Sequence, residues 1–147
     1  MTHIQSTVTD VSKFGRVGVL YGGTSSEREI SLLSGQAIYG ALKNLGINAV
    51  AIDAQDDVLQ QLIQHELDYV FIALHGPGGE DGTVQGALEY LQLPYTGSGV
   101  LASALAMDKQ RCKQLWKGIG LPTCDFIILN EDTDWKAALV DLGEKAM

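Results

Sequence analysis

Two glycine-rich loops, each directly after an apolar stretch, carry the residues of this chain best suited to chemistry. The first loop reads Tyr-Gly-Gly-Thr-Ser-Ser-Glu over positions 21–27 and supplies Gly22, Gly23 and Glu27. The second reads His-Gly-Pro-Gly-Gly-Glu-Asp-Gly over positions 75–82 and begins with His75 and Gly76. Because glycine has no Cβ, backbone N–H groups in such loops can approach an anion closely. The loops therefore predict a site for a small carboxylate or phosphate.

Three charged or titratable residues near these loops each allow two interpretations. Glu27, at the start of a predicted helix, either caps that helix or holds the ammonium group of a substrate. His75 is either bonded to a backbone carbonyl or faces a ligand, and its place after an apolar strand favours the ligand. Lys109 is either a solvated surface charge or a contact for a bound phosphate.

Strands and helices alternate along the chain, and this order indicates how the loops are positioned. The sequence predicts an α/β fold with an open, mainly parallel, doubly wound sheet and helices on both faces. In such sheets ligands bind beyond the carboxyl ends of the strands, which is where both loops begin. Strands are expected at 16–21, 47–52, 69–74, 93–96 and 126–129, with helices in the intervals and a last helix after 135.

The helix after the first loop has clear end signals. Ser26 is expected to be its N-cap, with Glu29 at the capping-box position three residues later. Apolar residues that include Ile30 and Leu33 recur at helical spacing, as on the buried side of an amphipathic helix. Gly46 supplies the expected C-terminal stop.

Three segments are expected along the chain: a polar tail at 1–15, an α/β domain at 16–106, and a segment at 107–147 that comprises a linking helix and the start of an incomplete second domain. In the last segment Trp135, Leu139 and Leu142 are apolar but have no predicted sheet to cover. Exposed apolar surface of this kind promotes association. Residues 123–147 are therefore predicted to be disordered or to be ordered by packing on another copy.

Composition excludes several functions. With 18 acidic and 10 basic residues the chain carries a formal net charge of −8, which argues against nucleic acid or an anionic membrane as its partner. No apolar stretch approaches the roughly 20 residues that span a bilayer. Two cysteines without a CxxC pattern favour a reducing compartment, hence the cytoplasm. Neither a P-loop nor a G-x-G-x-x-G fingerprint is present.

Four motifs taken together resemble the D-alanine–D-alanine ligase family. They are the two loops, the run Tyr-Thr-Gly-Ser-Gly at 95–99 and Met-Asp-Lys at 107–109, all in the family's order and at its intervals. The resemblance extends from about residue 16 to the end of the chain. It implies the pre-ATP-grasp domain of an ATP-grasp enzyme, followed by the first elements of the ATP-grasp domain.

This resemblance implies an ATP-dependent ligase that joins two D-alanines through an acyl phosphate for peptidoglycan synthesis, with Mg²⁺ at the ATP phosphates. Glu27 would hold the ammonium of the first D-alanine, His75 would lie by its carboxylate beside Gly22, Gly23 and Gly76, and Lys109 would contact ATP phosphates. The family's metal ligands have no counterpart in this sequence, so the chain alone is expected to be inactive. The resemblance also implies a homodimer.

Two alternatives of another class remain. In the first, the chain is a stand-alone module that binds a small carboxylate or phosphate and catalyses no reaction. In the second, it is a scaffold that uses the same fold only to dimerise. A binding module should take up D-alanine or a nucleotide in a calorimetric titration, whereas a scaffold should take up neither.

Overall fold

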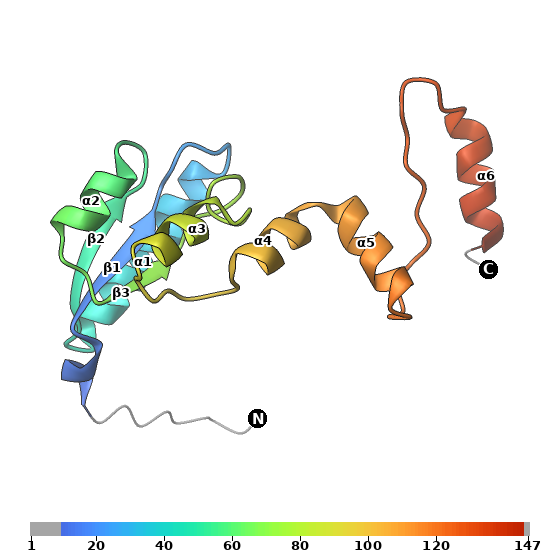
Figure 1. Ribbon diagram of the computed structural model, residues 1–147. Helices are drawn as coiled ribbons and strands as arrows, with labels where there is room; N and C mark the ends of the chain where they lie inside the picture. Colours follow the sequence, from blue (N-terminus) through green and yellow to red (C-terminus); the bar gives the residue numbers. More distant parts are fainter. Residues whose placement is uncertain (1–9, 146–147) are drawn as a thin grey trace. The chain divides into compact units, whose positions relative to one another are not determined.

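The computed structural model describes residues 10–145, and these fall into two compact units, one up to Ala104 and one from Leu105. The first unit begins with a short 3-10 helix, η1 (Val11–Phe14). Three parallel strands follow, β1 (Arg16–Tyr21), β2 (Asn48–Asp53) and β3 (Tyr69–Ile72), in the order β2-β1-β3. The open parallel α/β sheet predicted from the sequence is confirmed (Figure 1).

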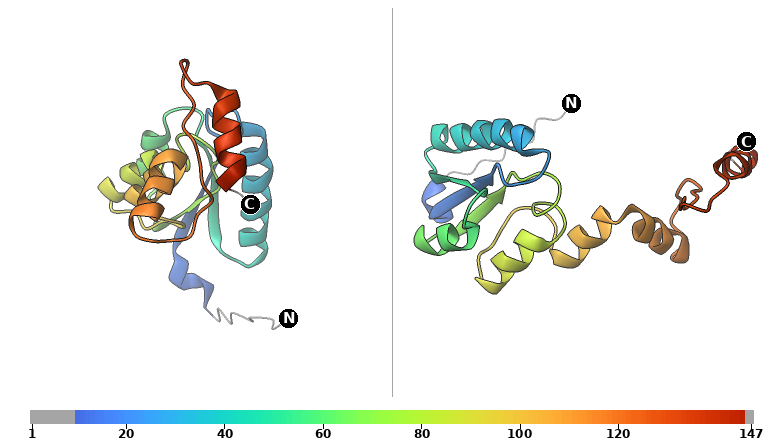
Figure 2. Two further views of the ribbon diagram at one scale, coloured as in Figure 1. Left: turned by 90° about the vertical axis from the view of Figure 1, so that its right-hand side faces the viewer. Right: turned by 90° about the horizontal axis from the view of Figure 1, so that it is seen from above.

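Helices cover both faces of this sheet. Helix α1 (Arg28–Asn44) lies on one face, and α2 (Val58–Gln64) and α3 (Thr83–Tyr90) lie on the other (Figure 2). The larger apolar side chains gather on the α2–α3 side. This core cluster consists of Leu20, Ile52, Leu62, Leu67, Val70, Leu74, Val84 and Leu88.

Helix α1 packs on the sheet through a different face from the one its apolar spacing predicts. Its buried residues are Ser31 and Gly35, whereas Ile30 and Leu33 are 58% and 67% exposed. The prediction of an apolar buried stripe containing them is therefore wrong. Small side chains let the helix approach closely, because a Cβ on Gly35 would collide with the side chain of Tyr21 on β1.

The fourth expected strand, 93–96, is reduced to a single parallel bridge between Val70 and Tyr95. Pro94 has no N–H to donate, so a regular ladder cannot continue through it. Its carbonyl still accepts a hydrogen bond from the N–H of Val70 at 2.9 Å, and the N–H of Thr96 donates to the carbonyl of Val70 at 3.0 Å. Helix α4 (Val100–Met107) follows.

The unit from Leu105 contains helices α5 (Lys109–Gly118) and α6 (Trp135–Lys145). The expected strand at 126–129 does not form, since no described segment pairs with it. Trp135 and Leu139 are exposed and border an apolar hollow of about 160 Å³. The hollow is lined by Ile127, Leu129, Trp135, Ala138, Leu139 and Leu142. Part of this segment is thus helical. The expectation that residues 123–147 are disordered or ordered by packing on another copy stays a prediction, and residues 146 and 147 lie outside those that the structure describes.

None of the helices within residues 10–145 combines the length and apolar character needed to cross a bilayer.

The close packing of α1 predicts opposite effects for two glycine substitutions in the same helix. Gly35→Ala should lower the free energy of unfolding by about 1–3 kcal/mol, because the new methyl group overlaps Tyr21. Gly40→Ala should raise it by about 0.5–1 kcal/mol, because its Cβ meets nothing within 4 Å and alanine is the better helix former. Urea denaturation of the two variants would measure both effects. A stabilising Gly35→Ala would contradict this account of the packing.

Candidate functional site

The two glycine-rich loops meet at the carboxyl edge of the sheet, as the sequence predicts. The hydroxyl of Ser25 in the first loop donates to the main-chain carbonyl of His75 in the second, at 2.8 Å. Gly76 has a φ of +69°, and a Cβ there would collide with the carboxylate of Glu27. Glu27 and His75 are thus brought to the same edge by two elements nearly fifty residues apart.

A cavity of about 300 Å³ opens between the loops. Its polar end contains Gly22, Gly23 and His75, and its apolar wall comes from α2, α3 and the residue after β2. Its remaining lining residues are Thr24, Ser25, Ala54, Val58, Leu59, Leu74, Pro77, Gly78, Gly79, Thr83, Val84 and Ala87. This volume lies at the lower end of the range usual for small-molecule pockets. Glu27 does not line the cavity.

Several loop amides expected to bind an anion are already engaged by the protein itself. The N–H of Gly22 donates to the Ser31 hydroxyl at 2.8 Å. The N–H of Gly76 donates to Glu80 Oε2 at 2.7 Å, and that of Gly78 to Asp81 Oδ2 at 2.8 Å. Gly22 and Gly76 therefore shape the loops in this structure, rather than offering free donors.

The acidic pair Glu80 and Asp81 organises the second loop from within. Asp81 also accepts a hydrogen bond from the N–H of Thr83 at 3.0 Å, which anchors the start of α3. These backbone donors, that of Gly78 foremost, hold the pKa of the Asp81 carboxyl below its usual range. The carboxylates thus serve the loop's conformation.

Serine hydroxyls on α1 fix the two loops, and sequence reasoning did not assign them this role. Ser31 is fully buried, and its hydroxyl accepts from the N–H of Gly22 and donates to the carbonyl of Ala73 at 2.7 Å. One turn along, Ser34 Oγ lies 3.1 Å from His75 Nε2. Their i, i+3 spacing, next to the buried Gly35, is the sequence signal that a polar face of this helix packs inward.

The start of α1 also differs from the expectation. Ser26 is not the N-cap: the helix begins at Arg28, and its N-cap, Glu27, makes no side-chain capping bond. Ser25 satisfies the first backbone donors instead. Its hydroxyl accepts a hydrogen bond from the N–H of Glu27 at 3.1 Å, and its carbonyl accepts one from the N–H of Arg28 at 3.2 Å. The exposed Glu27 carboxylate is consequently left without a recorded partner among the described residues.

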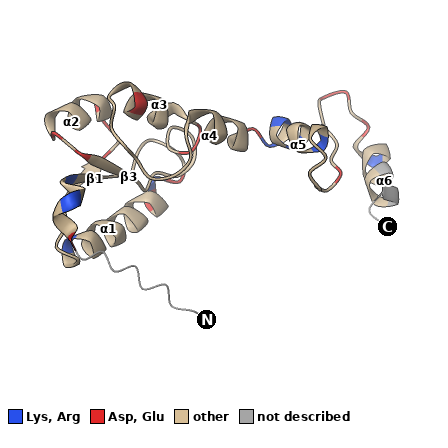
Figure 3. Cartoon of the chain, turned by 60° about the horizontal axis from the view of Figure 1, so that its bottom comes forward, with Lys and Arg blue, Asp and Glu red and all other residues tan. Residues whose placement is uncertain are grey.

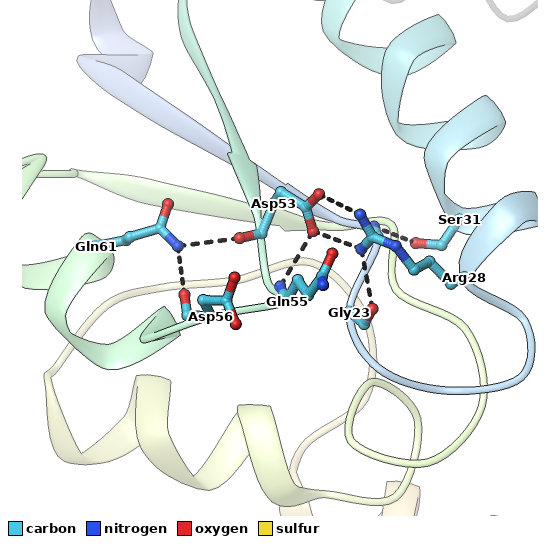
Figure 4. A network of polar contacts seen from close by, with 8 residues as sticks. Gly23, Arg28, Ser31, Asp53, Gln55, Asp56 and Gln61 are labelled. Carbon is cyan, nitrogen blue, oxygen red and sulfur yellow. Dashed lines mark hydrogen bonds and ion pairs between the residues drawn. The ribbon is translucent and has the colours of Figure 1, made fainter.

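A bidentate ion pair between Arg28 and Asp53 connects the first loop to the end of β2 (Figure 4). The Arg28 guanidinium donates to both carboxylate oxygens of Asp53, at 2.7 and 2.6 Å, and to the carbonyl of Gly23 at 3.0 Å. Gly22 has a φ of +75°, and a Cβ there would run into this pair. The Arg28 side chain holds the pKa of the Asp53 carboxyl below its usual range.

Lys109 lies in the other unit, at the first position of α5. Helix α5 carries four of the chain's ten basic residues, which are blue in Figure 3. Arg111 pairs with Asp108, Lys117 with Asp125 at 2.6 Å, and Lys113 donates to the carbonyl of Cys124 at 3.0 Å. Of these four cations, Lys109 alone has no recorded partner within residues 10–145.

The described part of the chain brings no three His, Cys, Asp or Glu side chains together in a way that would hold a metal ion. Within residues 10–145 the side chains therefore offer no complete protein site for Mg²⁺.

The fold and the site define an α/β domain whose paired loops enclose a cavity at the carboxyl edge of a parallel sheet. Comparisons with known proteins are specific. Residues 51–98 match the family model described as the D-ala D-ala ligase N-terminus. The chain is similar to the N-terminal part of D-alanine–D-alanine ligases, and the resemblance carried by its motifs is confirmed.

Curated relatives support this at high identity. A D-alanine–D-alanine ligase of Pseudomonas putida is 56% identical over 134 residues, which cover 91% of this chain and 42% of the relative. One from Stutzerimonas stutzeri is 54% identical over 143 residues, covering 97% and 45%. The chain therefore spans less than half the length of these relatives.

Solved structures agree. The D-alanine–D-alanine ligase of Bacillus anthracis complexed with ATP is 38% identical, with a TM-score of 0.71, over 86% of this chain and 42% of that one. The ligase of Aeromonas hydrophila is 29% identical, with a TM-score of 0.72, over 90% and 59%.

The Arg28–Asp53 pair predicts a specific acid dependence of stability. Because folding lowers the pKa of Asp53 below its ordinary 3.8, the pair's stabilisation is complete above that value and is lost as the pH falls through the folded pKa. Asp53→Asn should thus cost more stability at pH 6 than at pH 3. Urea denaturation at both pH values would measure this.

Asp56→Asn is the matched control, since Asp56 lies three residues along and its carboxylate makes no recorded hydrogen bond among the described residues. Asp56→Asn should lower the free energy of unfolding by less than Asp53→Asn does, and its loss should differ less between pH 6 and pH 3. Equal losses for the two variants would show that Arg28 does not stabilise Asp53 specifically.

Proposed function

We propose that this chain is the substrate-side portion of an ATP-dependent D-alanine–D-alanine ligase. In the proposed reaction, ATP phosphorylates the carboxylate of one D-alanine, and the amine of a second attacks the acyl phosphate to give the dipeptide, ADP and phosphate. The observation that carries the proposal is the junction of the two loops, where Ser25 binds the main chain of His75 and Glu27 lies against Gly76.

Each proposed role fits the chemistry of the side chain. Glu27 binds the ammonium of the first D-alanine, which suits an exposed carboxylate with no recorded partner of its own among the described residues. His75 lies by the substrate carboxylate, with Gly22, Gly23 and Gly76 shaping the loops around it. Lys109 contacts the ATP phosphates, for which a cation without a recorded internal partner in residues 10–145 is suited.

These contacts stabilise the negative charge that accumulates at the reacting groups. The first step brings a carboxylate and a phosphate together, so cations and oriented donors at that point lower the barrier, by a few kcal/mol for a well-placed donor. The ammonium site orients the substrate. Mg²⁺, proposed to neutralise the ATP phosphates, would be held by the part of the ligase beyond this chain.

The proposal extends to the setting of the enzyme. The product would serve peptidoglycan synthesis, the enzyme would act in the cytoplasm, and the ligase would be a homodimer. The 147-residue chain by itself is proposed to be inactive, because the relatives are more than twice its length.

Substituting Glu27 tests the ammonium site. In a polypeptide of the relatives' length that carries this sequence, Glu27→Gln should raise the KM for the first D-alanine by about 10- to 100-fold, the effect of losing a charged hydrogen bond. Initial rates of ADP release at varied D-alanine would measure it. Glu29→Gln, an exposed carboxylate on the first turn of α1, is the matched control and should leave the KM within about twofold.

The 147-residue chain gives the complementary test. With ATP, Mg²⁺ and D-alanine it should release no ADP above background, and turnover at ordinary enzymatic rates would contradict its proposed inactivity. Equal effects of Glu27→Gln and Glu29→Gln in the longer polypeptide would contradict the role of Glu27.

A further inference from the structure

The hydroxyl of Ser34 lies among three possible partners, and its single proton decides the state of His75. Ser34 Oγ is 3.0 Å from the carbonyl oxygen of Ile30, 3.2 Å from that of Ser31 and 3.1 Å from His75 Nε2. A serine hydroxyl has one proton to donate and two lone pairs to accept with. The two carbonyl oxygens can only accept.

The proton of Ser34 therefore goes to the backbone. Serine within a helix commonly donates to the carbonyl four residues earlier, here Ile30. If the proton instead went to His75, the Ser34 oxygen would face two carbonyl oxygens at hydrogen-bond distance with no proton in either contact. Lone pairs at such distances repel, so this arrangement is disfavoured. Ser34 consequently accepts from His75, and Nε2 carries a hydrogen.

The other nitrogen of His75 is left for a ligand. Within residues 10–145 no hydrogen-bond partner of His75 Nδ1 is recorded, and His75 is among the residues that line the cavity between the loops. The main chain of His75 is held separately, by Ser25. With Nε2–H bound to Ser34, a neutral ring presents Nδ1 as an acceptor, and a protonated ring presents it as a donor to an anion.

We infer that Ser34 is a positioning residue, which keeps a proton on His75 Nε2 and so makes Nδ1 the nitrogen that meets the ligand. The assignment of the proton follows from the hydrogen bonds alone. Its meaning for catalysis rests on the proposed function, in which His75 lies by the carboxylate of D-alanine. The protonated ring would donate a hydrogen bond from Nδ1 to an anionic group there, whereas the neutral ring would accept one at Nδ1.

Nitrogen-15 NMR of the histidine-labelled 147-residue chain tests the proton assignment. At a pH where the imidazoles are neutral, His75 should be the Nε2–H tautomer, with a slowly exchanging Hε2 proton, and His75→Gln identifies its signals. Ser34→Ala should abolish the slow exchange, and Ser34→Thr, whose hydroxyl can make the same contacts, should restore it. The signals of His65 in the same spectra should not move.

Ser25→Ala is the matched control, because it frees the carbonyl of His75 without touching the ring. It should leave the Hε2 proton in place. An Nδ1–H tautomer in the unaltered chain would overturn the inference. So would a Ser34→Ala variant whose Hε2 proton still exchanges slowly. If Ser34→Ala does not fold, the tautomer of the unaltered chain and the Ser34→Thr spectrum decide the question.

The catalytic meaning is tested separately, in a polypeptide of the relatives' length. Ser34→Ala should weaken D-alanine binding about three- to tenfold, the effect of one lost hydrogen bond, with recovery in Ser34→Thr. An unchanged affinity beside an altered tautomer would overturn the positioning role. Absence of D-alanine binding by the unaltered polypeptide would instead refute the proposed function and leave the proton assignment intact.

Discussion

The buried hydroxyl of Ser31 is the contact on which the site depends. It accepts from the N–H of Gly22 and donates to the carbonyl of Ala73, so a single oxygen joins the ends of β1 and β3 to α1. Without it, a buried donor and a buried acceptor would both lose their partner, which costs about 1–3 kcal/mol for each unsatisfied group. With it, the two loops start from fixed points.

The other polar contacts extend this arrangement outward. Arg28 holds the first loop to the end of β2 through Asp53, and Ser25 connects that loop to the second. The second loop is held by its own carboxylates. The protein satisfies these groups internally. The Glu27 carboxylate and His75 Nδ1, by contrast, have no recorded partner within residues 10–145 and are available to a ligand.

The sequence predicts the sheet and the edge at which the loops meet, because apolar strands and glycine loops leave strong local signals. Glu27 and His75 lie at that edge, and their roles stay predictions. Sequence reasoning misjudged the packing of α1, since apolar spacing predicts a buried Ile30 and Leu33, while the real contact is made by small residues whose fit depends on the neighbouring strand. It also missed Ser31 and Ser34, because a hydroxyl's partners lie far away in sequence. The strand expected at 126–129 does not form for a similar reason, because a strand is stable only when a neighbouring segment pairs with it.

The distance in sequence between the partners at this site has a consequence for how the protein acquires it. The hydrogen bonds that join the loops and α1 link residues separated by 41, 42 and 50 positions. Local segments can form helices early, but these bonds close only when the parallel strands have paired, the step that makes such topologies slow to fold. A partly folded form in which β1 and β3 have not paired therefore lacks the bonds that hold His75, and an intact site marks a chain in which these two strands are already joined.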